Sequence, residues 1–272
     1  MFYQMFRSGA RMNVTDYSYT RMVCGGENTK AAYYEVIDST EQNAIGFVVF
    51  IQDQNTLADY LLDIAIGAAG SEVIVLPNLY VGGHKEDYSM HVGGFVVLPI
   101  PLPAGTRVSV RGQTNYSLAG EVDLTVMLIT GGDLHSNAPL SVVDTYGANT
   151  SESDGTDVTV DEGAFSSWVE ITSGITENIK GFFLSLVDNN TVYDGEFYAR
   201  LDIGVGSAGN EVKIVDGLPI NVRTGGYEGN YGSIWPKYTP FFPISIASGQ
   251  RVVVRVKGNI AYSIGVILHG LR

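Results

Sequence analysis

Apolar and polar residues alternate with a period of two in many short segments of this chain. In one segment, the apolar residues Leu62, Ile64 and Ile66 are separated by Asp63 and Ala65. Successive side chains of a β-strand point to opposite faces of a sheet, so this pattern predicts a strand with one buried and one polar face. The period is two rather than the 3.6 residues of a helix. The pattern therefore predicts an all-β chain.

Further strand-like segments in the first half of the chain occupy residues 44–52, 73–80, 94–100 and 121–130. Each is bounded by Gly, Pro, Asn or Asp, which favour turns. Seven or eight short strands in about a hundred residues predict two packed sheets, a β-sandwich. The long connection at residues 80–94 favours a jelly roll over a meander of tight hairpins. An immunoglobulin-like sandwich is the alternative.

The same segments recur in the second half of the chain. Residues 62–73 (LDIAIGAAGSEV) align without gaps with residues 201–212 (LDIGVGSAGNEV), and eight of the twelve positions are identical. Shorter matches flank this block in the same order, at residues 35–37 and 170–172, 46–47 and 181–182, and 105–111 and 249–255. Matches in the same order along both halves predict an internal duplication.

We therefore expect two tandem jelly-roll-like β-sandwich domains, at residues 28–131 and 160–272. Residues 132–159 between them have weak periodicity and many Asn, Ser and Asp residues, which predicts a connector. Residues 1–27 lie outside the repeat. They are expected to form an N-terminal arm that is either frayed or paired with a neighbouring subunit.

Composition and charge exclude some classes of function, although they say little more about the fold. Hydrophobic residues make up 45% of the chain and charged residues 17%, which is typical of a folded globular protein. A formal net charge of −13 argues against a nucleic-acid partner and against an anionic lipid surface. No segment approaches the roughly 18 apolar residues of a membrane span, so we expect no membrane insertion. The single cysteine, Cys24, excludes an internal disulfide framework.

No sequence motif carries recognisable catalytic chemistry. The P-loop, dinucleotide, nucleophile-elbow and zinc-protease spacings are absent, so we expect no enzyme, no cofactor and no metal. Asp63 and Glu72, repeated as Asp202 and Glu211, are the paired carboxylates that a glycosidase would need. Because each occurs once per copy at corresponding positions, a turn or strand-end hydrogen bond is the better interpretation.

Two further groups of charged residues have a structural and a functional interpretation. The acidic segment at residues 151–157 has oxygen ligands for Ca²⁺ but lacks the spacing of the twelve-residue calcium loop, which favours a solvated linker. Arginines recur at corresponding strand positions, and we expect them to pair with carboxylates or to cover apolar surface rather than to bind an anion. These arginines are Arg107 and Arg111, repeated as Arg251 and Arg255.

The most informative segments are the loops at residues 80–94 and 222–238, which lie at the same place in the two copies. The second loop is five residues longer, and both contain aromatic residues among glycines. Loops that vary on a repeated scaffold commonly carry specificity, and aromatic rings suit sugars or a protein partner. The alternative is that the rings cover the open end of a sandwich core. The candidate binding residues are Tyr80, His84, Tyr88, His91, Tyr227, Tyr231, Trp235 and Tyr238.

Residues 61–72 (LLDIAIGAAGSE) and 98–108 (LPIPLPAGTRV) resemble segments of poorly described structural proteins of tailed bacteriophages. The resemblance implies a virion component, such as a tail-fibre, neck or capsid-decoration protein, made in the host cytoplasm. It implies other virion proteins and further copies of itself as partners, with a host-surface glycan as another candidate ligand. It assigns no functional residues. A tandem carbohydrate-binding module of a bacterial protein is the second hypothesis, and a glycan-degrading enzyme the third.

Overall fold

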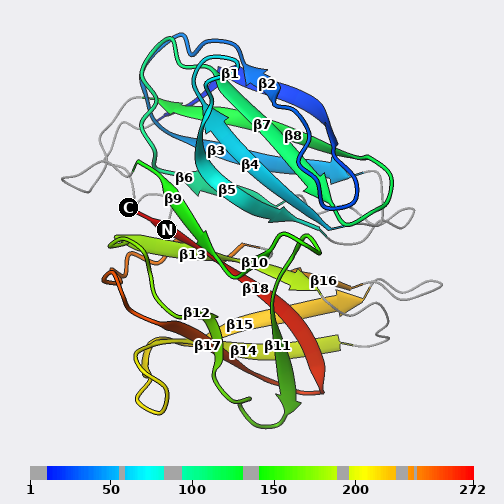
Figure 1. The fold of residues 1–272 in the computed structure, drawn as a ribbon, viewed down its shortest axis with the longest axis vertical. Coiled ribbons are helices and arrows are strands. Elements are labelled where there is room, and N and C mark those ends of the chain that lie inside the picture. Colours follow the sequence, from blue (N-terminus) through cyan, green and yellow to red (C-terminus); the bar gives the residue numbers. More distant parts are fainter. Residues whose placement is uncertain are drawn as a thin grey trace.

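The computed structural model describes residues 11–54, 59–82, 94–130, 141–188, 196–224, 232–235 and 238–272. These residues form 18 strands and no helix, which confirms the all-β prediction. Within these ranges, no helix is long and apolar enough to cross a membrane. Figure 1 shows the strands gathered into two units, one above the other. We call residues 11–130 the first unit and residues 141–272 the second unit.

The first unit consists of two four-stranded sheets whose neighbouring strands are antiparallel. The first sheet has the order β1-β8-β3-β6 and the second the order β2-β7-β4-β5. Eight strands in this order form a jelly-roll sandwich, as the long connections in the sequence predict. The strands are β1 (Arg11–Cys24), β2 (Tyr34–Ile37), β3 (Ala44–Gln54), β4 (Tyr60–Ile66), β5 (Val73–Val81), β6 (Phe95–Leu98), β7 (Val108–Thr114) and β8 (Gly120–Thr130).

The second unit has a corresponding strand order. Here β11-β18-β13 takes the place of β1-β8-β3, and β12-β17-β14-β15 takes the place of β2-β7-β4-β5. A short parallel pairing between β11 and β17 joins the two sheets. The strands are β9 (Val143–Tyr146), β10 (Ala148–Asn149), β11 (Asp154–Glu162), β12 (Val169–Thr172), β13 (Gly181–Asp188), β14 (Glu196–Val205), β15 (Val212–Thr224), β16 (Gly232–Trp235), β17 (Val252–Gly258) and β18 (Tyr262–Leu271).

Each unit has its own apolar core between its sheets. Leu62 and Ile64 lie in the core of the first unit, and Leu201 and Ile203 lie in that of the second; all four are fully buried. At the end of β4, Ile66 is partly buried and packs against the first core. The alternation along this repeated strand therefore predicts the buried face correctly in both units.

The structure differs from the sequence analysis at the start of each unit. Residues 11–24 belong to the segment expected to be an arm, but they form β1 and pair with β8 along its whole length. In the same way, β9 lies inside the expected connector and β11 crosses its end at residue 159. Both strands pair with β18. Met22 on β1 and Val158 on β11 are both fully buried core residues. Each strand therefore has apolar side chains that become buried only when the strand is part of a sandwich.

Candidate functional site

Two of the candidate binding residues, Tyr80 and Tyr238, lie where the two units meet. Each sheet has one face that points into the core of its own unit and one that points away from it. We call the second of these the outer face. On the outer face of β4, Leu61 is paired across the strands with Tyr80 on β5 and with Gln113 on β7. The exposed fractions of these residues are only 0%, 1% and 2%, although they lie outside the core of the first unit. The second unit therefore covers this row.

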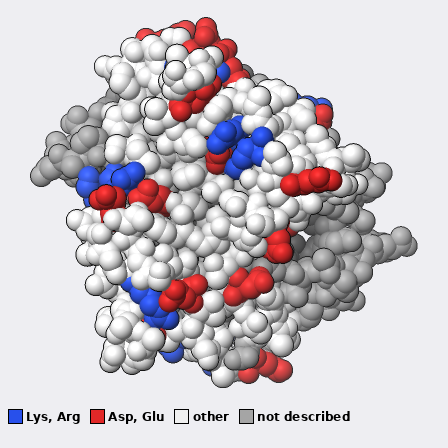
Figure 2. All heavy atoms as spheres, viewed as in Figure 1, with Lys and Arg blue, Asp and Glu red and all other residues white. Residues whose placement is uncertain are grey.

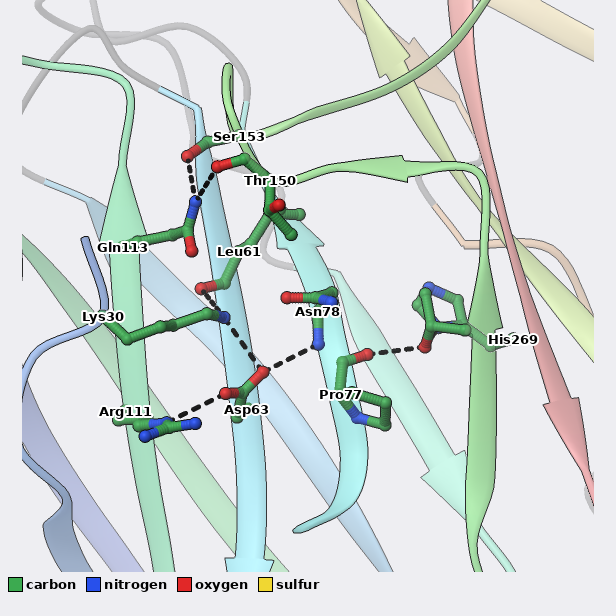
Figure 3. Close-up of polar contacts among 11 residues, drawn as sticks. Lys30, Leu61, Asp63, Pro77, Asn78, Arg111, Gln113, Thr150, Ser153 and His269 are labelled. Atoms are coloured by element: carbon green, nitrogen blue, oxygen red, sulfur yellow. Dashed lines mark hydrogen bonds and ion pairs between the residues drawn. The ribbon is translucent and has the colours of Figure 1, made fainter. Parts of the chain in front are cut away.

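Apolar and polar groups both contribute to this contact. Leu61 and Tyr80 form a buried cluster with Val187 on β13 and Ile267 on β18. The side-chain amide of Gln113 donates hydrogen bonds to the carbonyl oxygen of Thr150 (2.7 Å) and to Oγ of Ser153 (3.0 Å). Figure 3 shows Gln113 reaching from β7 to this turn of the second unit. Buried polar groups that are paired across a contact fix the orientation of its two sides.

Tyr238 brings together the bases of the two candidate loops. Its hydroxyl group donates a 2.6 Å hydrogen bond to the carbonyl oxygen of Tyr80, where the first loop begins. Its ring packs against Gly94, where the first loop ends; a Cβ atom at Gly94 would lie 2.4 Å from the ring. Burial raises the pKa of the Tyr238 hydroxyl group above its usual range. Tyr238 therefore remains a neutral hydrogen-bond donor.

The hydroxyl group of Tyr80 anchors a third connection. It donates a 2.5 Å hydrogen bond to Oδ1 of Asp59, which precedes β4. The other carboxylate oxygen, Oδ2, accepts a 3.0 Å hydrogen bond from the side-chain amide of Asn115, which follows β7. These bonds link the connections at one end of the first sandwich to the contact between the units.

The structure describes the side chains of only some of the candidate binding residues. Tyr80 and Tyr238 are 1% and 9% exposed, so their rings present almost no surface to another molecule. The ring of Tyr80 packs between the two units with Leu61, Val187 and Ile267, rather than over the open end of a sandwich core. Trp235 lies at the end of β16, and only its backbone is described. The remaining candidates, His84, Tyr88, His91, Tyr227 and Tyr231, lie outside the described residues.

His269 lies in the same contact, and its sequence context gave no sign of a special role. It is fully buried on β18, and its ring stacks on Phe183 with 4.6 Å between the ring centroids. The Thr145 hydroxyl group donates to the carbonyl oxygen of Pro77 in the first unit (2.6 Å), so it accepts from Nδ1 of His269 (3.1 Å). Nε2 is then unprotonated and accepts from the Ser185 hydroxyl group (2.8 Å).

The pairing of Ser185 with His269 resembles part of a hydrolytic site in composition only. Both residues are 0% exposed, so no substrate can reach the hydroxyl oxygen. Burial lowers the pKa of His269 from 6.5 to about 3. The ring is therefore neutral at physiological pH, with one nitrogen donating and the other accepting. This geometry supports a structural role.

The carboxylate of Asp63 is held by groups from three segments of the first unit. It accepts hydrogen bonds from Nζ of Lys30 (2.9 Å), from Nε of Arg111 (2.9 Å) and from the backbone N–H of Asn78 (3.0 Å). Figure 3 shows Asp63 at the centre of these groups. Burial lowers the pKa of Lys30, and the neighbouring Asp63 partly opposes this effect.

Asp202 occupies the corresponding position on β14. It is 0% exposed and accepts hydrogen bonds from Arg255 (2.8 Å) and from the backbone N–H of Gly217 (2.9 Å). The guanidinium group of Arg255 lies 4.5 Å from the ring centroids of both Phe165 and Trp168. The repeated aspartates are therefore both buried, and each binds the corresponding repeated arginine.

A second repeated network closes the turn that follows β4. Nε of Arg107 donates to Glu35 (2.8 Å), and its Nη1 donates to Glu72 (3.1 Å) and to the carbonyl oxygen of Gly67. Glu72 also accepts from the backbone N–H of Gly70 (2.9 Å). Backbone hydrogen bonds and Arg107 lower the pKa of Glu72. The second unit repeats the arginine contacts with Arg251, Glu170, Glu211 and Gly206.

These networks agree with the interpretation that the repeated carboxylates serve the fold. Gly67 and Gly206, whose carbonyl oxygens accept from these arginines, have φ angles of 108° and 121°. This backbone conformation strongly favours glycine, which accounts for the repeated glycine at this turn. In the acidic segment, the pKa of Asp154 is raised to about 6 by burial and by the neighbouring Glu152. Among the described residues, no group of three or more His, Cys, Asp or Glu side chains is arranged to hold a metal ion.

The charged side chains on the face drawn in Figure 2 form small mixed groups, and most Lys and Arg side chains lie beside Asp or Glu.

No family model matches the chain, and no curated protein matches it either. The function must therefore be argued from the fold, the contact between the units and the exposed surfaces.

Proposed function

We propose that the chain is a non-enzymatic structural subunit of a tailed-bacteriophage virion, in a tail fibre, neck or capsid decoration. In this role it binds other virion subunits or the host surface. Jelly rolls are widely used in viral capsid proteins and in lectins, where the sandwich is a scaffold. The resemblance of residues 61–72 and 98–108 to phage structural proteins points to the first of these uses.

The observation that carries the proposal is the way the two sandwiches are joined. Leu61 and Tyr80 of the first unit are buried against Val187 and Ile267 of the second, and Tyr238 is hydrogen-bonded to the Tyr80 backbone. A buried contact with paired polar groups favours one fixed arrangement over two freely moving modules. A rigid block of this kind suits a load-bearing assembly and keeps its outer surfaces available for neighbours.

A tandem carbohydrate-binding module is the second candidate. Lectins share the jelly-roll scaffold, and the rings of Tyr34, Tyr116 and Tyr198 are 37%, 43% and 51% exposed. Exposed aromatic rings can stack on the apolar faces of sugars. These rings are distributed over both units, on β2, in the β7–β8 connection and on β14, so they do not define one shared sugar site.

The proposal is tested on particles from the strain that carries the gene. Virions are purified by density-gradient centrifugation, and each fraction is analysed by quantitative mass spectrometry. We expect the chain to follow the particle peak with a constant ratio to the major capsid protein. Recovery only in the particle-free fractions would contradict a virion role. In that case, binding of the purified chain to a glycan array would support the second candidate.

A further inference from the structure

Residues 147–155 of the second unit form a small hairpin, in which β10 folds back onto the start of β11. We call it the junction hairpin. On one side of it β9 pairs with residues 268–271 of β18, and on the other side β11 pairs with residues 262–266. In the first unit, the corresponding strand β1 pairs with β8 on both sides of residues 14–16, which take the place of the hairpin. The junction hairpin therefore distinguishes the second unit from the first.

The junction hairpin is docked on the first unit by neutral hydrogen bonds. Ser153 is 0% exposed, and its hydroxyl group donates to Oδ1 of Asn28 (2.6 Å). The side-chain amide of Gln113 donates to the same hydroxyl oxygen and to the carbonyl oxygen of Thr150, as Figure 3 shows. None of these groups titrates near neutral pH, so these bonds hold the hairpin equally well over that range.

The backbone is strained on both sides of this contact. Of the four described non-glycine residues with a positive φ angle, three lie here: Glu27, Asn28 and Ser153, at 51°, 59° and 60°. A residue with a side chain adopts this conformation at a cost, and the conformation persists only where surrounding contacts hold it. Such residues gather at binding sites and at switch regions.

The carboxyl group of Asp154 lies beside these contacts. Asp154 follows Ser153 in the chain and is paired with Asn149 across the hairpin. Its Oδ1 atom is buried and has no hydrogen-bond partner in the part of the chain that the structure describes. Burial without a partner costs more for an ionised carboxylate than for a neutral carboxyl group, which also carries a donor of its own. The geometry therefore favours the protonated form.

Three further carboxylates repel an ionised Asp154, one from the hairpin, one from β11 and one from the first unit. They are Glu152, Asp157 and Asp59. The other described strands beside Asp154 contribute neutral groups, namely the amide of Asn149 on β10 and apolar side chains of β18. Burial and the three carboxylates raise the pKa of Asp154 to about 6, and Asn149 opposes this shift only in part.

Asp59 makes this repulsion a contact between the two units. Its two carboxylate oxygens accept hydrogen bonds from Tyr80 and from Asn115. Both oxygens thus act as acceptors, as in an ionised carboxylate. At neutral pH an ionised Asp154 of the second unit therefore lies near a carboxylate of the first unit. A proton on Asp154 removes this repulsion.

We propose that the junction hairpin is a proton-controlled latch between the two units, closed on the first unit when Asp154 is protonated and opened more often when Asp154 is ionised. Opening moves the carboxylate away from Asp59 and into water. The apolar contact of Leu61 and Tyr80 with Val187 and Ile267 does not titrate, so the two sandwiches stay joined while the hairpin opens. The latch is a property of the chain alone and does not depend on the proposed virion role.

The direction and size of the effect follow from proton linkage. The pKa of Asp154 is about 6 in the closed hairpin, against an ordinary value of 3.8 that the open hairpin restores. The proton therefore stabilises the closed hairpin fully below pH 3.8, and this contribution is lost as the pH rises through 6. Between about pH 7.5 and about pH 5, the equilibrium constant for opening should fall by up to about tenfold.

Hydrogen–deuterium exchange of the full chain measures this opening. Exchange of the amides in residues 147–155 is followed by mass spectrometry at about pH 7.5 and about pH 5, and corrected for the intrinsic exchange rate at each pH. We expect up to about tenfold less opening at the lower pH. Amides of β17 serve as the internal reference for unfolding of the whole chain, and they should not share this gain in protection.

Three variants isolate the latch. Asp154→Asn is neutral at every pH, so its hairpin should open equally rarely at both. The matched control is Asp157→Asn, which removes an exposed carboxylate from the same strand and should keep most of the pH dependence. Ser153→Gly permits the positive φ angle but removes the hydrogen bonds of the hydroxyl group. It should open more often at both pH values.

Equal opening of the unaltered hairpin at both pH values would overturn the inference, as would a pH dependence that persists in Asp154→Asn. Carbon-detected NMR titration of the unaltered chain gives an answer that needs no variant. A midpoint near 6 for the Asp154 carboxyl group supports the latch, and a midpoint near 3.8 contradicts it. Neither result changes whether the chain is found in purified particles, so failure of the latch and failure of the virion role remain distinguishable.

Discussion

Acidification should weaken the fold through His269, the buried histidine between the two units. Its pKa is about 3 in the folded chain, against an ordinary value of 6.5, because burial disfavours the charged ring. A folded-state pKa below the unfolded value means that the unfolded chain binds the proton first. The contribution of neutral His269 is therefore complete above pH 6.5 and is lost as the pH falls from 6.5 toward 3.

The size of the effect follows from the proton linkage. At about pH 5 the histidine is protonated in the unfolded chain but not in the folded chain. Each pH unit below the unfolded pKa costs about 1.4 kcal/mol, so His269 should remove about 2 kcal/mol from the free energy of unfolding at about pH 5. Urea denaturation at neutral pH and at about pH 5 measures this change.

The variant His269→Gln isolates the histidine from other titrating groups. All other carboxylates and histidines remain, so the loss on acidification should be about 2 kcal/mol smaller in the variant than in the unaltered chain. Asp154 acts in the opposite direction. Its pKa is raised to about 6, so its unfavourable contribution disappears as the pH falls through 6 toward 3.8. Equal pH dependence in the unaltered chain and in His269→Gln would refute the reasoning.

Three further predictions concern other contacts. Tyr238→Phe leaves the buried carbonyl oxygen of Tyr80 without its donor and should cost about 1–2 kcal/mol of unfolding free energy, measured by urea denaturation. Arg255→Met leaves Asp202, which is 0% exposed, without its main cation and should cost about 3 kcal/mol by the same measurement. Trp235→Ala should weaken binding to the partner about thirtyfold, the equivalent of about 2 kcal/mol, measured by surface plasmon resonance on immobilised virion subunit or glycan.

Each of these variants has a matched control. Tyr116→Phe removes a hydroxyl group from a ring that is 43% exposed, and Arg200→Ala removes an exposed cation from the same sheet face as Arg255. Both should change the free energy of unfolding by less than about 0.5 kcal/mol. For Trp235→Ala, an unchanged affinity would remove this residue from the recognition surface. A loss of folding would instead assign the ring to the core.

The features predictable from the sequence were those with a local signal. The alternation at Leu62 and Ile64 fixes which face of β4 is buried, and its recurrence at Leu201 and Ile203 reveals the second sandwich. The first strand of each unit was missed because the repeat is weak there. The alternation of Val158 and Val160 on β11 was a usable sign, but acidic and small residues around it favoured a connector.

The contact between the units could not be predicted from local patterns. Tyr80 and Gln113 lie on an outer sheet face, where the alternation leads one to expect solvent, and they are buried only because the second unit covers them. Tyr238 has the same sequence context, a ring after a glycine-rich loop, whether it binds a partner or packs internally. His269 likewise owes its buried position to β9, β13 and the first unit together.

We propose that the two stacked jelly rolls form a rigid building block of a virion. Cryo-electron microscopy of the purified particles tests it most directly. We predict repeated density into which the two units fit as one body. Density for the chain that fits only when the two sandwiches are moved apart, or particles without any density for it, would contradict the claim.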